Sequence, residues 1–345
     1  MIKVLIVDDS ALVRKVFSRE LAKAGDIEVV GTAHDPYMAR DRIVELKPDV
    51  VTLDIEMPRM DGLTFLEKLM KYYPMPVVVV SSLAQEGGET ALKALELGAV
   101  EVVAKPSASY SVNEMGPQLI QKVRAAACVN IDNIRKNRIQ NTAALAKNRT
   151  AMIKTSSKVI AIGASTGGTE AIKDVLVGLP ANMPPILVVQ HMPPYFIKAF
   201  AARLNSMCTL EVKEATDGES VTSGKVLIAP GNKHMELRRS GANYYVVLND
   251  KPLVHYQRPA VEILFDSVAQ YAGSNAIGVI LTGMGKDGAK GLLNMKTAGA
   301  YTIAQDEQSS IVFGMPKEAI NLGAAATVAS LSDIPALLIK VSNTL

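Results

Sequence analysis

The sequence predicts an α/β protein with two doubly wound domains, each organised around a parallel or mostly parallel β-sheet. Its 345 residues suggest two domains, at about 150 residues per domain. Apolar runs alternate with helical stretches in both halves, which is the pattern of repeated βαβ units. Between the halves, residues 122–158 carry nine Lys or Arg and one acidic residue, Asp132. We therefore expect a first domain at 1–121, a basic linker at 122–156 and a second domain at 157–345.

The composition excludes several classes of protein. Hydrophobic residues make up 48% of the chain and charged residues 21%, which excludes a mainly disordered chain. No apolar run approaches the ~18 residues of a membrane-spanning helix, and the N-terminus lacks a signal-peptide pattern. The two cysteines, Cys128 and Cys208, are too few for a disulfide framework or a zinc site. We expect a cytoplasmic protein without membrane insertion and, because nothing in the sequence requires an oligomer, a monomer.

Five apolar runs in the first domain predict the strands of one parallel sheet. They are Val4–Val7, Val29–Thr32, Val50–Leu53, Val77–Val80 and Val100–Val103. Amphipathic stretches between them, such as Ser10–Ala24 and Leu63–Tyr72, predict helices. In a doubly wound sheet the functional residues lie at the carboxyl ends of the strands.

Polar residues follow these strands in a pattern that predicts a phosphoryl-accepting carboxylate. Asp8 and Asp9 follow the first strand, Asp54 the third, Ser81 the fourth and Lys105 the fifth. Three carboxylates in one crevice repel each other, and a Mg²⁺ ion would offset that repulsion. The lysine and the serine could hold an anion beside the metal. An acidic loop cluster with a solvated lysine is the alternative, and the complete set of residues in order favours the phosphoryl-accepting site.

The motifs LIVDDSALVR, VTLDIEMPRMDG, VVVVSS and AKP resemble the receiver domain of two-component response regulators. The resemblance implies a flavodoxin-like fold, phosphorylation of Asp54 by a histidine kinase, and switch roles for Ser81 and Lys105. It also implies four Mg²⁺ ligands: Asp8, Asp9, Asp54 and, through its main-chain carbonyl, Glu56. Val102 stands where many receivers have an aromatic residue. We therefore expect no tyrosine-type rotamer switch.

The second domain opens with a possible nucleophile turn. An apolar strand at Val159–Ile162 leads into the glycine-rich segment GASTGG, and a helix is predicted at Thr169–Leu176. Glycines around Ser165 match the G-x-S-x-G nucleophile elbow of serine hydrolases. The same pattern could cradle a phosphate at a helix N-terminus. This motif alone leaves both alternatives open.

A histidine and an aspartate at similar positions decide between these alternatives. The chain has four histidines: His34, His191, His234 and His255. Only His191 directly follows a strongly apolar strand, at Ile186–Val189, whereas His234 falls in a turn. Asp287 follows a third strand, at Ile277–Leu281, where helix capping is the alternative role. Histidine can take a serine proton and aspartate can orient the histidine, so we predict a catalytic triad with Ser165.

The order Ser165…His191…Asp287 differs from the order in the familiar serine hydrolases, including the α/β-hydrolases. The nucleophile elbow therefore does not place the domain in that fold. Glycines surround Met284, and we expect its backbone N–H to be a candidate oxyanion donor. The N–H of Thr166, directly after the nucleophile, is a second candidate.

The segments GASTGG, QHMPP, IAPGNKHM, LTGMGKDGAKGL and DEQSSIVFGMP, in this order, resemble the CheB family of chemotaxis-specific protein-glutamate methylesterases. The resemblance implies that Ser165 is the nucleophile, His191 the base and Asp287 the orienting acid, without a cofactor for the esterase chemistry. It implies demethylation of glutamate methyl esters, and deamidation of specific glutamines, on chemoreceptors. It further implies that the unphosphorylated receiver covers the catalytic face and that phosphorylation relieves this.

Three other functions are less consistent with the sequence. A DNA-binding response regulator would need a basic recognition helix, yet residues 159–345 carry equal numbers of acidic and basic residues. The basic linker has no aromatic residue for base stacking, so we expect no nucleic-acid partner. A nucleotide-binding module would leave His191 and Asp287 unexplained. A related esterase acting on a different, non-chemotaxis receptor array remains an alternative.

Overall fold

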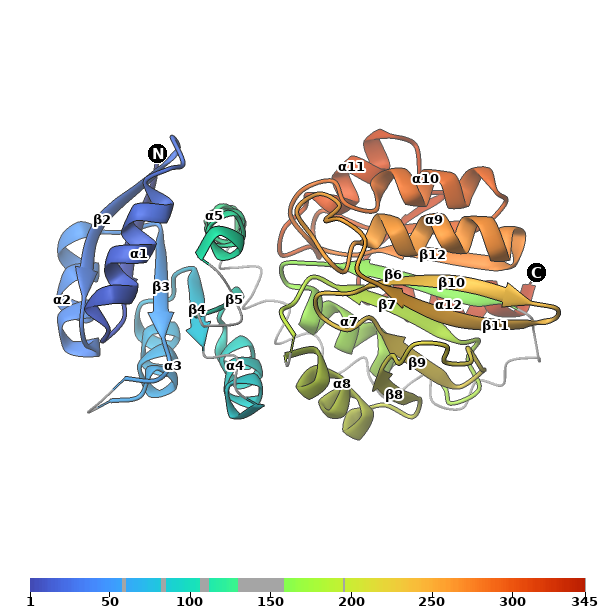
Figure 1. Cartoon of the computed structure of the whole chain (residues 1–345), viewed down its shortest axis with the longest axis horizontal. Helices are drawn as coiled ribbons and strands as arrows, with labels where there is room; N and C mark the ends of the chain where they lie inside the picture. The colour runs from blue at the N-terminus through green and yellow to red at the C-terminus, as the bar shows by residue number, and fades with distance from the viewer. Residues whose placement is uncertain (58–59, 82–84, 106–111, 130–157, 195, 345) are drawn as a thin grey trace. The chain divides into compact units, whose positions relative to one another are not determined.

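The structure is a computed structural model that describes residues 1–344 except 58–59, 82–84, 106–111, 130–157 and 195. The chain divides into two compact units, Met1–Ile131 and Asp132–Leu345. Figure 1 labels their helices and strands. The last helix of the first unit ends at Ala127, beyond the expected domain boundary at 121. Residues 130–156 of the expected linker lie outside the described residues.

The first unit contains, in its described residues, a five-stranded parallel sheet. Its strands are β1 (Ile2–Val7), β2 (Ile27–Ala33), β3 (Val50–Asp54), β4 (Val77–Ser81) and β5 (Glu101–Ala104). The spatial order is β2-β1-β3-β4-β5, and every neighbouring pair is parallel. This strand order is that of the flavodoxin-like fold, as the sequence predicts.

Helices cover both faces of this sheet. They are α1 (Ala11–Leu21), α2 (Pro36–Leu46), α3 (Gly62–Tyr72), α4 (Gln85–Leu97) and α5 (Val112–Ala127). Local sequence explains where two of them begin. Ser10 accepts a hydrogen bond from Val13 N–H at the start of α1, and Asp61 does the same for Thr64 N–H at the start of α3.

The second unit contains, in the part of the chain that is described, a seven-stranded parallel sheet. Its strands are β6 (Val159–Ala164), β7 (Ile186–Gln190), β8 (Glu211–Glu214), β9 (Lys225–Ile228), β12 (Ala276–Ile280), β13 (Tyr301–Gln305) and β14 (Thr327–Ala329). The spatial order is β14-β13-β12-β6-β7-β9-β8. A separate antiparallel hairpin consists of β10 (His234–Ser240) and β11 (Asn243–Asn249). Both units are thus doubly wound α/β folds, as expected.

Helices also cover both faces of the second sheet (Figure 1). They are α7 (Gly168–Val177), α8 (Phe196–Met207), α9 (Val261–Ala272), α10 (Ala289–Thr297), α11 (Met315–Asn321), α12 (Ile334–Thr344) and the short 3-10 helix η1 (Gly273–Asn275). Helices α9 and α10 pack on each other and on β12, and their buried side chains, such as Phe265 and Leu292, form one core with the hairpin. Among the described helices, none is both long and apolar enough to cross a bilayer.

Candidate active site

Three neighbouring strands of the second sheet bring the predicted triad to one edge. Strand β6 lies between β12 and β7, and Ala164 of β6 is the register partner of Gln190 of β7. The next residues along these two strands are Ser165 and His191. Asp287 lies in the segment between β12 and α10. Because parallel strands all end at the same edge, three residues far apart in sequence become neighbours.

His191 and Asp287 make a direct contact. His191 Nε2 lies 2.7 Å from Asp287 Oδ2, and both side chains are buried. An ionised carboxylate accepts but cannot donate, so the imidazole carries its proton on Nε2. This leaves Nδ1 as the basic nitrogen. The backbone N–H of His191 donates to Ala164 O at 3.2 Å, which keeps His191 beside the strand that ends at Ser165.

Asp287 also caps helix α9. Its two carboxylate oxygens accept the backbone N–H groups of Val261, at 2.7 Å, and Glu262, at 3.0 Å. These are the first two residues of α9, whose own N-cap residue, Ala260, provides no side-chain hydrogen bond. The capping role considered from the sequence is therefore present, but on a different helix from the one that follows Asp287. A single carboxylate therefore contacts the histidine and caps the N-terminus of α9.

These contacts keep Asp287 ionised. Burial on its own would raise the pKa of Asp287, but the hydrogen bond and charge of His191 outweigh it. The two backbone N–H groups of α9 act in the same direction. The pKa of the carboxyl is therefore lower than its usual 3.8. At neutral pH Asp287 is a buried anion that can stabilise a protonated histidine.

Glycines let the nucleophile turn and the β12 loop approach closely. Gly167, at φ +76°, occupies the left-handed region just before α7 begins. A Cβ on Gly283 would lie 2.8 Å from Ser165 Cβ and would collide with Met315 Sδ. The next residue after Gly283 is Met284, which is half-buried. Gly283 therefore lies against Ser165, and Met284, whose N–H is a candidate oxyanion donor, is the next residue along the chain.

The remaining histidines of the second unit lie close to this site. We expected His234 in a turn, and this was wrong. It begins β10 and is fully buried. Its Nδ1 accepts Ala260 N–H at 3.2 Å, and its Nε2–H donates to Pro252 O at 3.0 Å. Met235 and Leu237, which follow in β10, are also buried. His234 thus supports the segment that leads into α9.

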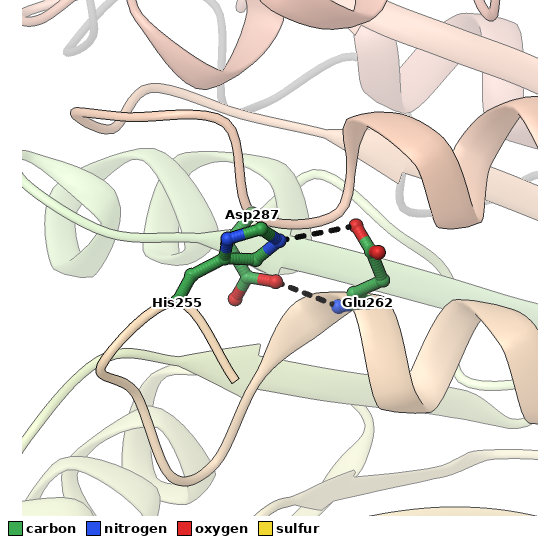
Figure 2. A group of neighbouring side chains, drawn as sticks. All are labelled: His255, Glu262 and Asp287. Atoms are coloured by element: carbon green, nitrogen blue, oxygen red, sulfur yellow. Dashed lines mark hydrogen bonds and ion pairs between the residues drawn. The ribbon is translucent and has the colours of Figure 1, made fainter. Parts of the chain in front are cut away.

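His255 belongs to a group of titratable side chains around Asp287. Figure 2 shows His255, Glu262 and Asp287, whose potential ligand atoms all lie within 4.8 Å of one another. His255 Nε2 is 3.6 Å from Glu262 Oε2. Burial raises the pKa of Glu262, the charge of His255 opposes this, and that of Asp287 adds to it. A cation here would sit at the N-terminus of α9, where the helix dipole disfavours positive charge. We therefore interpret the group as the electrostatic surroundings of Asp287.

The first unit brings its predicted site residues to the carboxyl edge of its own sheet. Carboxylate oxygens of Asp8, Asp9 and Asp54 lie within 4.8 Å of one another. Lys105 Nζ lies 2.8 Å from Asp54 Oδ1 and 4.0 Å from Glu56 Oε2. The same Asp54 oxygen accepts Glu56 N–H at 2.9 Å. Asp54 is fully buried, and its second oxygen, Oδ2, has no hydrogen-bond partner among the described residues.

Burial perturbs the titration of this cluster. Burial, and then the charge of Asp54, raises the pKa of Asp8 to about 6. Burial also raises the pKa of Asp54, against the hydrogen bond from Lys105. For Lys105, burial alone would lower the pKa, but the hydrogen bond and charge of Asp54 raise it above 10.5. The lysine is therefore a fixed positive charge beside Asp54.

The residues fit the Mg²⁺ ion that a receiver domain uses. Among the described residues, Asp8 Oδ2 and Asp54 Oδ2 are buried without a hydrogen-bond partner. A buried carboxylate oxygen without a partner is costly unless a cation compensates it, and carboxylates are the ligands that Mg²⁺ prefers. Ser81 is buried at the end of β4, and Val102 is buried in β5, at the position noted in the sequence.

Comparison with known proteins identifies the family. Residues 160–338 match the CheB methylesterase family, and residues 4–115 match the response regulator receiver domain. The protein-glutamate methylesterase/protein-glutamine glutaminase 2 of Syntrophus aciditrophicus is 60% identical over 333 residues, which cover 96% of this chain and 97% of that protein. The chain belongs to the CheB methylesterase family.

Two further relatives support this assignment of the chain to the CheB family. The protein-glutamate methylesterase/protein-glutamine glutaminase of Salmonella choleraesuis is 53% identical over 344 residues, covering 99% of this chain and 97% of that protein. The crystal structure of the Thermotoga maritima CheB methylesterase catalytic domain matches with a TM-score of 0.53 and 45% identity. It covers 54% of this chain and 100% of that domain. The second unit therefore has the fold of the CheB catalytic domain, and the receiver domain precedes it in the chain.

Sequence reasoning missed several groups that hold the site of this CheB-family chain together. The N–H groups of Val261 and Glu262, which bind Asp287, belong to the backbone and have no side-chain signature. The hydroxyl of Thr282 and the amide of Gln190 contact the nucleophile turn. Both residues sit inside the motifs LTGMGKDGAKGL and QHMPP, so their motif positions were the available signal.

Proposed function

We propose that this chain is a phosphorylation-activated serine hydrolase that demethylates glutamate methyl esters and deamidates specific glutamines on chemoreceptors. The observation that carries the proposal is the buried 2.7 Å contact between His191 and Asp287 at the strand end beside Ser165. An aspartate that holds a histidine in one tautomer next to a serine is the arrangement that nucleophilic acyl transfer requires. Relatives that span the whole chain are named for both activities.

In the proposed reaction, Ser165 Oγ gives its proton to His191 Nδ1 and attacks the γ-carbonyl carbon of the substrate side chain. The carbonyl oxygen becomes an oxyanion, which backbone N–H groups of Thr166 and Met284 stabilise. The intermediate collapses as the C–O or C–N bond breaks, and the histidine proton leaves with methanol or ammonia. Water then attacks the acyl-serine by the same route, releasing glutamate and regenerating the hydroxyl.

Asp287 stabilises the protonated histidine in both halves of this cycle. It is already ionised, because its pKa is lowered by His191 and by the N-terminus of α9. The carboxylate does not need to reorganise when His191 becomes positively charged. Methyl ester and primary amide share the γ-carbonyl at which the reaction occurs. One site can therefore perform both reactions, which differ only in the leaving group.

We further propose that Asp54 of the receiver accepts a phosphoryl group from a chemotaxis histidine kinase. Its carboxylate oxygen would displace the kinase histidine at phosphorus. When bound, Mg²⁺ would be held by Asp8, Asp9, Asp54 and the carbonyl of Glu56, and would neutralise phosphoryl charge. Lys105 supplies a further positive charge 2.8 Å from Asp54.

Activation then follows as a population shift. In the family, the unphosphorylated receiver restricts access to the catalytic face, and phosphorylation with Ser81 as the switch residue weakens that restriction. No new catalytic chemistry is needed, because the phosphorylated state only has to favour the open arrangement. The proposal places the chain in the cytoplasm, as a monomer, with the kinase and methylated chemoreceptors as partners.

Ser165→Ala tests the chemistry. Methanol and ammonia release from methylated and amidated chemoreceptor membranes should each fall by about 10³-fold or more, because the nucleophile is lost. Ser206→Ala is the matched control, because Ser206 is an exposed helical serine whose hydroxyl contacts Arg203 O within its own helix. The control should retain wild-type rates. Methanol release that survives in Ser165→Ala would contradict the triad assignment.

A generic ester separates chemistry from substrate. Suppose that the wild type hydrolyses the generic ester through Ser165 but releases no methanol from chemoreceptors. This result would support the proposed hydrolase mechanism. It would contradict the chemoreceptor substrate and favour a related esterase acting on another receptor array.

A further inference from the structure

Thr282 is the first residue after β12 that faces the nucleophile turn. It is fully buried, and its carbonyl oxygen accepts the backbone N–H of Ser165 at 3.0 Å. One residue earlier, Leu281 N–H donates to Gly163 O at 2.9 Å. The hydrogen-bond ladder between β12 and β6 therefore continues past the ends of the strands, and it includes the backbone N–H of Ser165.

The side chain of Thr282 holds the other end of the same turn. Its hydroxyl donates to Thr166 O at 2.9 Å and accepts Val312 N–H at 2.9 Å, with Val312 O at 3.2 Å. Thr282 thus binds the turn twice, at the N–H of Ser165 and at the carbonyl of Thr166. These two bonds bracket the Ser165 side chain and the N–H of Thr166 that we propose as an oxyanion donor.

The peptide between Ser165 and Thr166 is also fixed at its carbonyl. Ser165 O accepts Gly168 N–H at 2.7 Å and Gln190 Nε2–H at 3.0 Å. Because a trans peptide is planar, fixing the carbonyl fixes the direction of the N–H on its opposite side. Thr282 binds the peptide groups on both sides of this one, through Ser165 N–H and Thr166 O, and so restricts where the plane lies relative to β12, the strand that leads to Met284.

Thr282 is itself held by a buried side chain. Gln305 Oε1, at the end of β13, accepts Thr282 N–H at 2.8 Å, and its Nε2–H donates to Ser309 O at 2.9 Å. Both Thr282 and Gln305 are fully buried. Each of these buried polar groups would cost about 1–3 kcal/mol if left unpaired. Arrangements in which these groups lose their partners are therefore disfavoured.

We infer that Thr282 is a positioning residue for the proposed esterase reaction. Its hydroxyl holds the carbonyl of Thr166, in the peptide group that follows the Ser165–Thr166 peptide, and so restricts the direction of the Thr166 N–H, the proposed oxyanion donor. It does not touch the substrate. The inference rests on the proposed function, since it assumes that Ser165 is the nucleophile.

The test compares Thr282→Val and Thr282→Ser in the full chain. Valine keeps the shape but removes the hydroxyl, and serine restores it. Misplacing a catalytic donor costs rate rather than substrate affinity, so Thr282→Val should lower kcat about tenfold to hundredfold with apparent KM within about twofold. Thr282→Ser should retain kcat close to wild type. Methanol release from methylated receptor membranes gives both constants.

Thr302→Val is the matched control. Thr302 is also fully buried, donates its hydroxyl to Ala324 O at 2.7 Å and accepts Ala326 N–H at 3.0 Å, but it contacts the β14 segment and not the nucleophile turn. Both valine variants should lower the melting temperature similarly, whereas only Thr282→Val should lower kcat. If Thr282→Val does not fold, Thr282→Cys, which keeps a weak donor and acceptor, should give an intermediate kcat.

Equal kcat values in Thr282→Val and Thr302→Val would overturn the inference and assign Thr282 a purely structural role. So would a cysteine variant with full activity. A Ser165→Ala variant that remains active would instead overturn the proposed function. The two failures are therefore distinguishable.

Discussion

At the scale of single residues, Asp287 combines two roles that are usually separate. Its carboxylate orients His191 and also caps α9 through two backbone N–H groups. The capping bonds lower the pKa of Asp287 and lock its rotamer, and both effects serve the histidine contact. The sequence led us to consider capping as an alternative to catalysis. In the structure the capping contacts hold the same carboxylate that meets His191.

His234 makes stability depend on pH. Burial lowers the pKa of His234 below its usual 6.5, and both ring nitrogens are used by the backbone in the neutral form. As pH falls below about 6.5, the unfolded chain binds a proton that the folded chain resists, so wild type loses stability toward the lower, folded pKa. His234→Gln removes this titration. The stability difference between wild type and variant should therefore shrink from pH 7 to pH 5, by up to about 1.4 kcal/mol per pH unit.

Denaturant unfolding of the full chain at several pH values measures this difference. Between pH 7 and pH 8, where histidine is mostly neutral in both states, the difference should change little. Parallel stability curves for wild type and His234→Gln down to pH 5 would contradict the role of the neutral imidazole.

At the scale of elements, the site is formed where β12, β6 and β7 end side by side. Strand β12 can approach the nucleophile turn only because residue 283 has no side chain. The loop that follows β12 then carries Met284 toward Ser165 and Asp287 toward His191. The packing of two loops, and not only the residues of the triad, determines the geometry of the site.

Gly283→Ala should disrupt this packing. Its Cβ would lie 2.8 Å from Ser165 Cβ and 3.1 Å from Ser165 N, so the nucleophile turn must shift. We expect about 1–3 kcal/mol of destabilisation from overpacking and a loss of methanol release of at least about tenfold. Steady-state methanol release and thermal unfolding measure the two effects.

Gly278→Ala is the control from the same β12. The three atoms nearest its Cβ would be side-chain atoms of Leu292 and Met295, the nearest at 2.7 Å. It should lower stability similarly but retain the wild-type rate. Equal loss of activity in Gly283→Ala and Gly278→Ala would contradict the claim that the close approach of β12 to Ser165 is required for activity.

The strands of the first unit were predictable from the sequence, and in the second unit β6, β7 and β12 were. Runs of apolar residues that are buried on both faces predicted the strands. For example, the run Val77–Val80 predicted β4 (Val77–Ser81) to within one residue. Helix ends were less accurate, because α1 ends at Leu21 rather than at Ala24, where apolar periodicity continues into a turn. We placed His234 in a turn because Pro230 and Gly231 precede it, whereas in the structure it begins β10 and its ring is held by Ala260 N–H and Pro252 O.

The contacts that support the site were not predictable in the same way. Strand ends identify Ser165, His191 and Asp287 as neighbours, because parallel topology places them on one edge. The α9 N-terminus and the Thr282 hydroxyl reach the site through tertiary packing. The α9 N–H groups have no side-chain signature, and the available signal for Thr282 was its position inside the motif LTGMGKDGAKGL.

At the scale of the whole molecule, a CheB-family catalytic unit follows a receiver unit in one chain. The receiver has a buried carboxylate, Asp54, that is paired with Lys105 and surrounded by further carboxylates. A phosphoryl group there would change the charge of the site and the partners of Lys105. The central claim of the proposed function is that this change controls Ser165.

The most direct measurement is methanol release from methylated chemoreceptor membranes by wild type and Asp54→Ala, each with and without acetyl phosphate and Mg²⁺. The phosphodonor should stimulate wild type, because phosphorylation shifts the population toward the open state. It should leave Asp54→Ala at its basal rate, and that basal rate should disappear in a Ser165→Ala background. Equal stimulation of wild type and Asp54→Ala, or no stimulation of wild type, would contradict control of the esterase through Asp54.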